Sequence, residues 1–331
     1  MTDTPVPARP SPVPAPATAG RSIALALGGG GARGLAHIPI LEAFDELGLR
    51  PKVIAGTSIG AIFAAAYASG LSGKQIRAHT YEVLKKRLDL VRDLYSARVR
   101  NKGGLLNAFA PRPAFLSAEK LLDIVLPPRI ARDFAHLTIP LKVVASDFYA
   151  QESVVFSSGA LRPAVAASMA LPVIFQPMVI EGRVLIDGGL VNPLPFDLIS
   201  DEADLTVAVD ASGAPVRRPG QQIPKAWETL FAANFIFERS IIREKLRTIQ
   251  PDLYIDAGTS RFQILDFLKI DEILAAAEPA KERVKAQLSR LIEAETLPVA
   301  EAIDHLPPPS APRSRLRLRR PILKRRRPAK G

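Results

Sequence analysis

The feature that most constrains this chain is the pentapeptide Gly-Thr-Ser-Ile-Gly at 56–60, which leads from the β-prone run 53–55 into an alanine-rich stretch. This pattern predicts a strand, a sharp turn and a helix. In a nucleophile elbow the serine occupies a strained turn, so the residues two before and two after it must be very small, as Gly56 and Gly60 are. Ser58 would then lie at a helix N-terminus, where developing negative charge is stabilised. Ser58 is the candidate nucleophile, although Gly and Ser are also common in ordinary turns.

The composition is that of a protein with a full hydrophobic core. The chain has 331 residues, of which 47% are hydrophobic, and this favours one large domain or one domain with appendages. It has no cysteine, which excludes disulfides and thiolate metal sites. No stretch approaches the roughly 18 to 20 apolar residues of a membrane span, so we expect no bilayer crossing within this sequence.

The net charge of +11 is concentrated in one segment. Residues 311–331 contain ten Lys and Arg and no acid, which leaves +1 for the remainder. A basic segment of this kind is usually a solvated arm, but it can also attract anionic lipid or nucleic acid. We expect a cytoplasmic location, with peripheral membrane contact through this segment as an alternative, and we expect no nucleic-acid partner.

The sequence predicts four regions. Residues 1–20 are rich in Pro and Ala and lack the pattern of a secretory signal, so we expect them to be disordered. A catalytic domain is expected over 21–215, and a helical part packed on it over 216–300. A Pro-rich and basic disordered tail is expected over 301–331.

A glycine-rich loop precedes the elbow by one βα unit. The run 22–27 predicts a buried strand that leads into the loop 28–34 and then a helix, which together with the next strand gives a parallel βαβ unit. The loop fits a dinucleotide fingerprint at Gly29, Gly31 and Gly34, but the acid expected after the second strand is missing. Alternatively, its backbone N–H groups form an oxyanion hole beside Ser58.

The second half of the chain supplies a candidate acid. Strands are predicted at 141–145, 153–156 and 205–209, a short helix at 162–169, and a hairpin at 178–186 that ends in Asp187. Gly188 and Gly189 follow this aspartate and free the backbone at the sheet edge. Locally, an ordinary Asp-Gly turn explains the same residues.

Other segments predict secondary structure but contain no candidate catalytic residue. A capping box at 72–75 opens a helix, and residues 96–116 predict a long loop that either covers the site or is plain surface. An apolar helical stripe that includes Phe237 runs through 224–249, and its core packing is favoured over a membrane-bound basic helix. Two more helices are predicted near 266–277 and 279–295.

Together, these motifs resemble those of the patatin-like phospholipases. The match spans about Ile23 to Asp210, and it includes Asn192-Pro193 and the segment Ser168-x-Ala170-x-Pro172-x-x-Phe175-x-Pro177. The resemblance implies a three-layer α/β/α sandwich with a mainly parallel central sheet. It also assigns the motif residues as follows: catalytic Ser58 and Asp187; oxyanion hole Gly29, Gly30, Gly31, Arg33 and Gly34; elbow Gly56 and Gly60; aspartate motif Gly188 and Gly189.

The resemblance implies a Ser-Asp dyad in place of a triad, and the histidines agree with it. There are four, His37, His79, His136 and His305. An α/β-hydrolase triad runs Ser, acid, His, and only His305 follows Asp187. His37 lies near the glycine loop, but a histidine on a helix face is more often structural.

The expected function is a serine lipid acyl hydrolase, a phospholipase A or lysophospholipase type of esterase that uses neither metal nor cofactor. Its partner would be a lipid or ester substrate. Arg33 would either neutralise a phosphate head group or shape the glycine loop. Two alternatives stay open: a dinucleotide-binding oxidoreductase, and a non-catalytic membrane- or nucleic-acid-associated protein.

Overall fold

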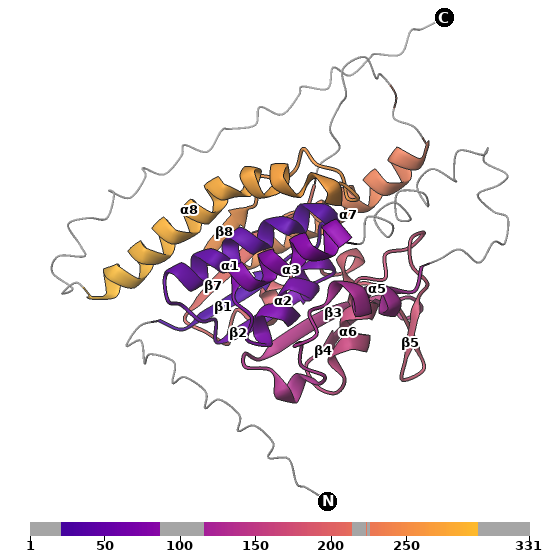
Figure 1. The fold of residues 1–331 in the computed structure, drawn as a ribbon, viewed down its shortest axis with the longest axis horizontal. Helices are drawn as coiled ribbons and strands as arrows, with labels where there is room; N and C mark the ends of the chain where they lie inside the picture. Colours follow the sequence, from indigo (N-terminus) through magenta and orange to yellow (C-terminus); the bar gives the residue numbers. More distant parts are fainter. Residues whose placement is uncertain (1–20, 87–115, 214–222, 224–225, 297–331) are drawn as a thin grey trace, which may run out of the picture. The chain divides into compact units, whose positions relative to one another are not determined.

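The computed structural model describes residues 21–86, 116–213, 223 and 226–296 (Figure 1). The predicted disordered N-terminus, nearly all of the predicted loop 96–116 and the basic tail lie outside these ranges. The chain divides into two compact units, Met1–Ile292 and Glu293–Gly331. The sheet and its covering helices belong to the first, except for the last helical residues, 293–296.

A single eight-stranded sheet forms the centre of the first unit, in the order β5-β6-β3-β2-β1-β7-β8, with β4 also pairing β3. Strands β3, β2, β1, β7 and β8 are parallel, whereas β4, β5 and β6 pair antiparallel. The sheet is therefore mainly parallel, as predicted. The strands are β1 (Ile23–Leu27), β2 (Val53–Thr57), β3 (Leu141–Asp147), β4 (Glu152–Phe156), β5 (Met178–Ile180), β6 (Arg183–Asp187), β7 (Leu205–Asp210) and β8 (Leu253–Asp256).

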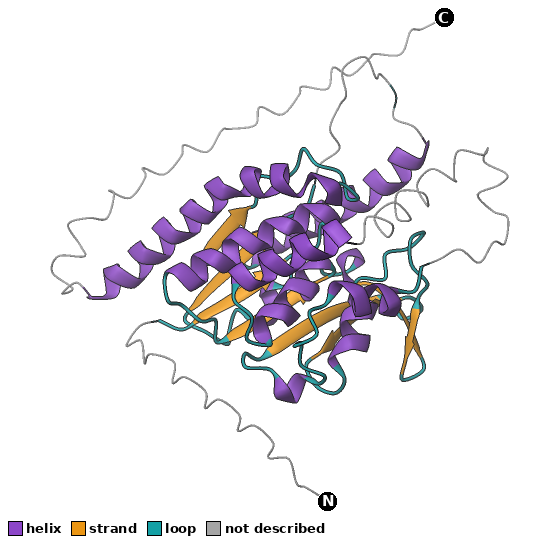
Figure 2. Ribbon diagram, in the orientation of Figure 1, coloured by secondary structure: helices purple, strands orange, loops and turns teal. Residues whose placement is uncertain are grey.

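Helices cover both faces of this sheet (Figure 2). The α-helices are α1 (His37–Glu46), α2 (Ile59–Ala68), α3 (Gly73–Lys86), α5 (Ala118–Val125), α6 (Leu161–Ser168), α7 (Ala226–Thr248) and α8 (Ile270–Thr296). The 3-10 helices are η1 (Gly31–Ala36), η3 (Phe134–His136), η4 (Gly188–Leu190), η5 (Phe196–Leu198) and η6 (Phe267–Lys269). No helix in the described ranges has the length and apolar character of a bilayer-spanning segment.

The two-residue period of β1 separates the two cores. Ile23, Leu25 and Leu27 pack into the larger core with α1, α2, α6 and α8, whereas Ala24 and Ala26 face a smaller core that contains η5 and Ile242 of α7. Every residue of this strand is buried, because helices cover both sides. The three-layer α/β/α sandwich is confirmed.

The predicted secondary structure needs corrections at α5, which was not predicted, and in the chain after residue 210. The edge strand β8, which pairs parallel with β7, was not predicted, because four residues are too few to show a clear hydrophobic periodicity. The two helices predicted at 266–277 and 279–295 are one helix, α8, which continues through Pro279. Proline removes only one backbone donor there, and buried Ala277, Ala280 and Val284 hold the helix on the core at either side of it.

The buried face of α7 also differs from the predicted apolar stripe. Phe237 is 61% exposed, whereas Phe235, Glu238 and Ile242 are buried. The predicted stripe is therefore right at Ile242 but wrong at Phe237. Glu238, an ionisable side chain, lies on the inner face of the helix.

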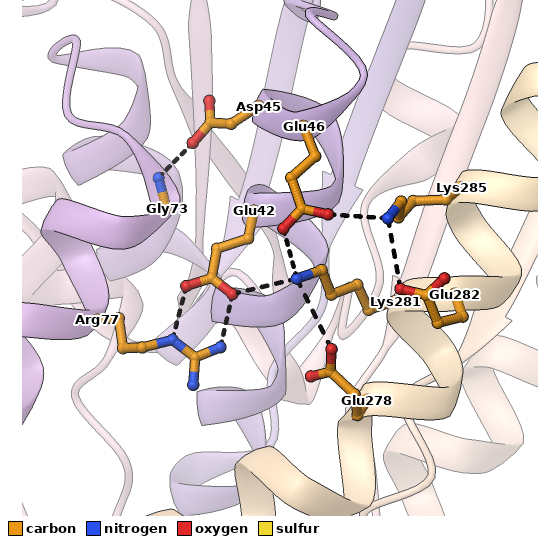
Figure 3. A network of polar contacts seen from close by, with 9 residues as sticks. All are labelled: Glu42, Asp45, Glu46, Gly73, Arg77, Glu278, Lys281, Glu282 and Lys285. Carbon is orange, nitrogen blue, oxygen red and sulfur yellow. Dashed lines mark hydrogen bonds and ion pairs between the residues drawn. The ribbon is translucent and has the colours of Figure 1, made fainter.

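A network of ion pairs attaches α8 to α1 and α3 (Figure 3). Lys281 lies 2.7 Å from Glu46 and 3.7 Å from Glu42, and its side chain is only 10% exposed. Glu42 also accepts two hydrogen bonds of 2.6 Å from Arg77 on α3. One helix turn away, Lys285 contacts Glu46 at 2.9 Å but is 30% exposed. Lys281 is therefore the buried centre of the network.

We expect Lys281→Met to lower the free energy of unfolding by about 2 kcal/mol, because it leaves the buried carboxylate of Glu42 and the partly exposed one of Glu46 with one cation fewer. The matched variant Lys285→Met removes a more exposed pair and should lower it by less than about 1 kcal/mol. Urea denaturation of both variants measures the difference. Equal losses in the two variants would contradict the assignment of Lys281 as the centre.

Candidate active site

Ser58 lies on a sharp turn between β2 and α2, as the pentapeptide predicts. Its φ of 56° is a conformation that residues other than glycine rarely adopt. A Cβ at Gly60 would lie 2.2 Å from the carbonyl oxygen of Leu27, and one at Gly56 would lie 2.7 Å from Cα of Ala61. Both glycines are therefore required by close packing of the backbone around the turn. This is the geometry of a nucleophile elbow.

The Ser58 hydroxyl donates a hydrogen bond of 2.6 Å to Oδ2 of Asp187. The aspartate ends β6, which pairs antiparallel with β3, and β3 in turn lies beside the β2 strand that leads to the elbow. Its other oxygen, Oδ1, accepts a hydrogen bond of 2.8 Å from the N–H of Gly189. The predicted nucleophile and acid are thus in direct contact although they are 129 residues apart.

The environment of Asp187 suits a base. The residue is 4% exposed, and burial raises the pKa of its carboxyl from 3.8 to about 6, against the hydrogen bonds from Ser58 and Gly189 that lower it. A carboxylate with a higher pKa accepts a proton from a hydroxyl more readily. At neutral pH this carboxyl is still mostly ionised.

The glycine loop lies against the elbow. A Cβ at Gly29 would lie 3.6 Å from Cβ of Ser58. The N–H groups of Gly28 and Gly29 are engaged, since they donate to the carbonyl oxygens of Val209 and Pro193. For the N–H of Gly30, the structure of the described residues shows no backbone acceptor. Gly30, one of the predicted oxyanion positions, thus offers a free donor in the loop.

Arg33 contacts the glycine loop from inside the protein. It is 2% exposed, its Nε donates to the carbonyl oxygen of Gly30 at 3.1 Å, and its guanidinium lies 4.1 Å from the ring centroid of Phe235 on α7. Burial lowers its pKa to about 10, so it stays charged. Of the two roles considered for Arg33, shaping the loop agrees with these contacts.

The histidines that the structure describes contact groups other than Ser58 and Asp187. His37 is fully buried, its Nε2 lies 2.8 Å from the carbonyl oxygen of Gly28, and burial lowers its pKa to about 4, so it is neutral. His79 contacts the carbonyl oxygen of Val125, and His136 pairs with Asp133. His305 lies outside the described residues. Among the histidines that the structure describes, none is recorded in a hydrogen bond to Ser58 or Asp187.

Two polar contacts around the dyad could not be predicted from the sequence. Ser168, at the end of α6, accepts a hydrogen bond of 2.8 Å from the N–H of Ser58, and it is fully buried. Thr57 donates to the carbonyl oxygen of Asn192 at 2.8 Å, which joins the elbow to the segment after the aspartate. Both segments belong to the motifs quoted above, but only the tertiary structure shows what they contact.

An apolar cavity opens beside the dyad. Ser58, Asp187, Glu238 and the loop glycines lie at its polar end. Its other walls are almost entirely aliphatic and aromatic, and come from α2, α3, α5 and the segments after α6 and β8. They include Ile62, Leu121, Val125, Leu171, Ile174 and Phe175. Such a cavity suits a long apolar group attached to a reactive polar one.

This chain belongs to the patatin-like phospholipase family, whose model matches residues 25–200, more than half of the sequence. The matched range contains the glycine loop, the elbow and the aspartate motif. It ends before α7 and α8.

Members of this family are similar in sequence to part of the chain. An uncharacterized NTE family protein of Mycobacterium tuberculosis is 36% identical over 201 residues, covering 60% of this chain and 52% of that protein. Patatin-like phospholipase domain-containing protein 7 of Rattus norvegicus is 32% identical over 267 residues, covering 73% of this chain and 19% of that protein. The chain thus spans about half, or less, of the length of these relatives. Among solved structures, VipD from Legionella pneumophila is similar with a TM-score of 0.43 and 16% identity, covering 81% of this chain and 67% of that one.

Proposed function

We propose that this chain hydrolyses carboxylic esters of lipids, as a phospholipase A or lysophospholipase type of enzyme, through a dyad of Ser58 and Asp187. The observation that carries the proposal is the 2.6 Å hydrogen bond from a serine on a nucleophile elbow to a buried carboxylate. Membership of the patatin-like phospholipase family supports it. The apolar cavity beside Ser58 supports a lipid as the substrate.

In the proposed reaction, the Ser58 oxygen attacks the ester carbonyl carbon while Asp187 takes the hydroxyl proton. The carbonyl oxygen becomes an oxyanion, which the N–H of Gly30 and the N-terminus of α2 stabilise. When the tetrahedral intermediate collapses, the ester C–O bond breaks and Asp187 returns its proton to the leaving alcohol. The acyl chain is then bound to Ser58. Water, deprotonated by Asp187, attacks the carbonyl carbon of this acyl-enzyme. When the second tetrahedral intermediate collapses, the bond to the Ser58 oxygen breaks, the fatty acid leaves and Asp187 returns its proton to that oxygen.

The test is release of free fatty acid from lipid by the purified full chain. Wild type and Ser58→Ala would be compared on vesicles of diacyl phospholipid, on lysophospholipid and on a neutral glyceride. We expect wild type to release fatty acid from at least one class and Ser58→Ala to release none above the rate without enzyme. Equal release by both variants, or none by wild type with any of them, would contradict the proposed function.

The pH dependence of hydrolysis gives a second prediction. Only ionised Asp187 can accept the proton of Ser58, so kcat should fall as the pH drops through about 6. One pH unit below that value, at pH 5, about a tenth of the wild-type activity should remain. Initial rates between pH 5 and pH 7 measure this. A rate that is flat over this interval would show that Asp187 does not titrate there and is not the base.

A further inference from the structure

One buried carboxyl beside the dyad is not used by the reaction described above. Glu238, on α7, is 6% exposed and lines the same cavity as Ser58 and Asp187. It lies 40 residues or so beyond the range that the family model matches. No role was predicted for Glu238, because on α7 it interrupts an apolar stripe.

Glu238 and Asp187 lie against the same glycine. A Cβ at Gly189 would be 3.0 Å from Oδ1 of Asp187 and 3.0 Å from Oε1 of Glu238. Oδ1 of Asp187 accepts the hydrogen bond of the Gly189 N–H, and Oδ2 accepts that of Ser58. By contrast, Oε2 of Glu238 is buried and has no hydrogen-bond partner among the described residues. The two carboxyls are thus close together, but both oxygens of Asp187 accept a hydrogen bond whereas Oε2 of Glu238 accepts none.

Two neighbouring buried carboxyls do not ionise together, because each negative charge disfavours the other. The group with the better hydrogen bonds keeps the charge, and here that is Asp187. We propose that Glu238 is a positioning residue that holds a proton beside Asp187, so that the site carries a single negative charge, first on Asp187 and then on the oxyanion that Ser58 generates. This inference rests on the proposed function, since it concerns the same reaction.

The charged groups around Glu238 agree with this role. They are Arg33 of η1, Asp187 at the end of β6 and Asp210 at the end of β7. Burial, and after it the charge of Asp187, raises the pKa of Glu238 to about 8, although Arg33 lowers it. The charge of Asp210 makes a smaller contribution to the same rise. Near neutral pH, Glu238 is therefore mostly protonated while Asp187 is mostly ionised.

Ionisation of Glu238 at higher pH would place a second negative charge at the cavity. That charge opposes formation of the negative oxyanion, so the reactivity of Ser58 should fall as the pH rises through about 8. One pH unit above that value about a tenth of Glu238 is still protonated. The rate should therefore fall about tenfold between pH 7 and pH 9.

The experiment measures the rate at which a fluorophosphonate labels Ser58 at pH 7 and at pH 9, so no natural substrate needs to be known. We expect the tenfold fall in wild type and less than a twofold fall in Glu238→Gln, whose amide stays neutral. The matched control is Glu244→Gln, an exposed glutamate on the same helix, which should keep the tenfold fall. An equal fall in Glu238→Gln and wild type would overturn the inference while leaving the proposed function intact. Absence of lipid hydrolysis in the vesicle assay would instead overturn the proposed function.

A spectroscopic readout does not depend on folding of the glutamine variant. Infrared spectra of wild type should show the carbonyl stretch of a protonated carboxyl at pH 7 that is lost by pH 9. In Asp187→Asn the same band should disappear at a lower pH, because the neighbouring negative charge is gone. A merely structural Glu238 would not link these two residues. Absence of the band at pH 7, or an unchanged titration in Asp187→Asn, would overturn the inference.

Discussion

Asp187→Asn is expected to lower kcat for ester hydrolysis by at least about 10³-fold at pH 7.5, which corresponds to about 4 kcal/mol of transition-state stabilisation. Asparagine keeps the shape of the side chain and a carbonyl oxygen that can accept the Ser58 hydrogen bond. It cannot take the proton, however, and the described residues place no histidine in contact with Ser58 to replace it. Steady-state kinetics with the lipid that wild type hydrolyses fastest measures the loss.

The thermal stability of Asp187→Asn shows whether a loss of activity comes from the missing base or from unfolding. The pKa of Asp187 is raised from 3.8 in the unfolded chain to about 6 in the folded protein. The stability that this shift contributes is present below pH 3.8 and is lost as the pH rises through 6. At neutral pH the buried charge therefore opposes folding by about 3 kcal/mol. We expect the Tm of Asp187→Asn at pH 7.5 to be at or above that of wild type. A folded, stable variant with near-normal kcat would show that Asp187 is not the base.

Gly30→Ala is expected to lower kcat by about 10² to 10³-fold, the loss typical of one oxyanion donor. A Cβ at this position would lie 2.3 Å from the carbonyl oxygen of Ala211, which is backbone and cannot turn aside. The loop must shift, and the N–H of Gly30 shifts with it. Kinetics under saturating substrate would show the change in kcat.

Gly48→Ala is the matched control for this variant. Gly48 also has a positive φ, of 67°, but a Cβ there would have no atom within 4 Å. It lies just after α1 and does not line the cavity at the active site. We expect a loss of about 1 kcal/mol in stability and no change in kcat. If Gly30→Ala behaved like Gly48→Ala, the oxyanion would have to be bound elsewhere.

The sequence predicted the part of the fold whose signals are local. The run before Ser58 is apolar throughout, as in a strand that is buried on both faces, and glycines flank the turn where the backbone leaves no room. The hairpin that turns at Glu181 and Gly182 ends at Asp187 in the structure as predicted. Because the parallel strands β1 and β2 end at one edge of the sheet, the glycine loop and the elbow could be predicted to lie side by side. Asp187 ends an antiparallel strand, and only the resemblance to the family implied that it meets Ser58.

What the sequence did not predict depends on contacts between distant segments. Ser168 bonds the backbone of Ser58 across 110 residues, and no local pattern indicates such a contact. Glu238 interrupts the apolar pattern of α7, and its burial becomes understandable only once Asp187 and Arg33 are seen beside it. The same holds for Phe237, which continues the apolar pattern but points away from the core. Periodicity predicts which helix face is apolar, but it cannot predict a polar site beneath it.

The most direct test of the Ser58–Asp187 dyad is the site of covalent modification by a fluorophosphonate. Wild type, Ser58→Ala and Asp187→Asn would each be incubated with the probe, and intact-mass and peptide mass spectrometry would count and locate the adduct. We predict one adduct on wild type, located on Ser58, none on Ser58→Ala, and labelling of Asp187→Asn slowed by at least about 10²-fold. An adduct on another residue, or equal labelling of wild type and Ser58→Ala, would contradict the assignment of Ser58 as the nucleophile.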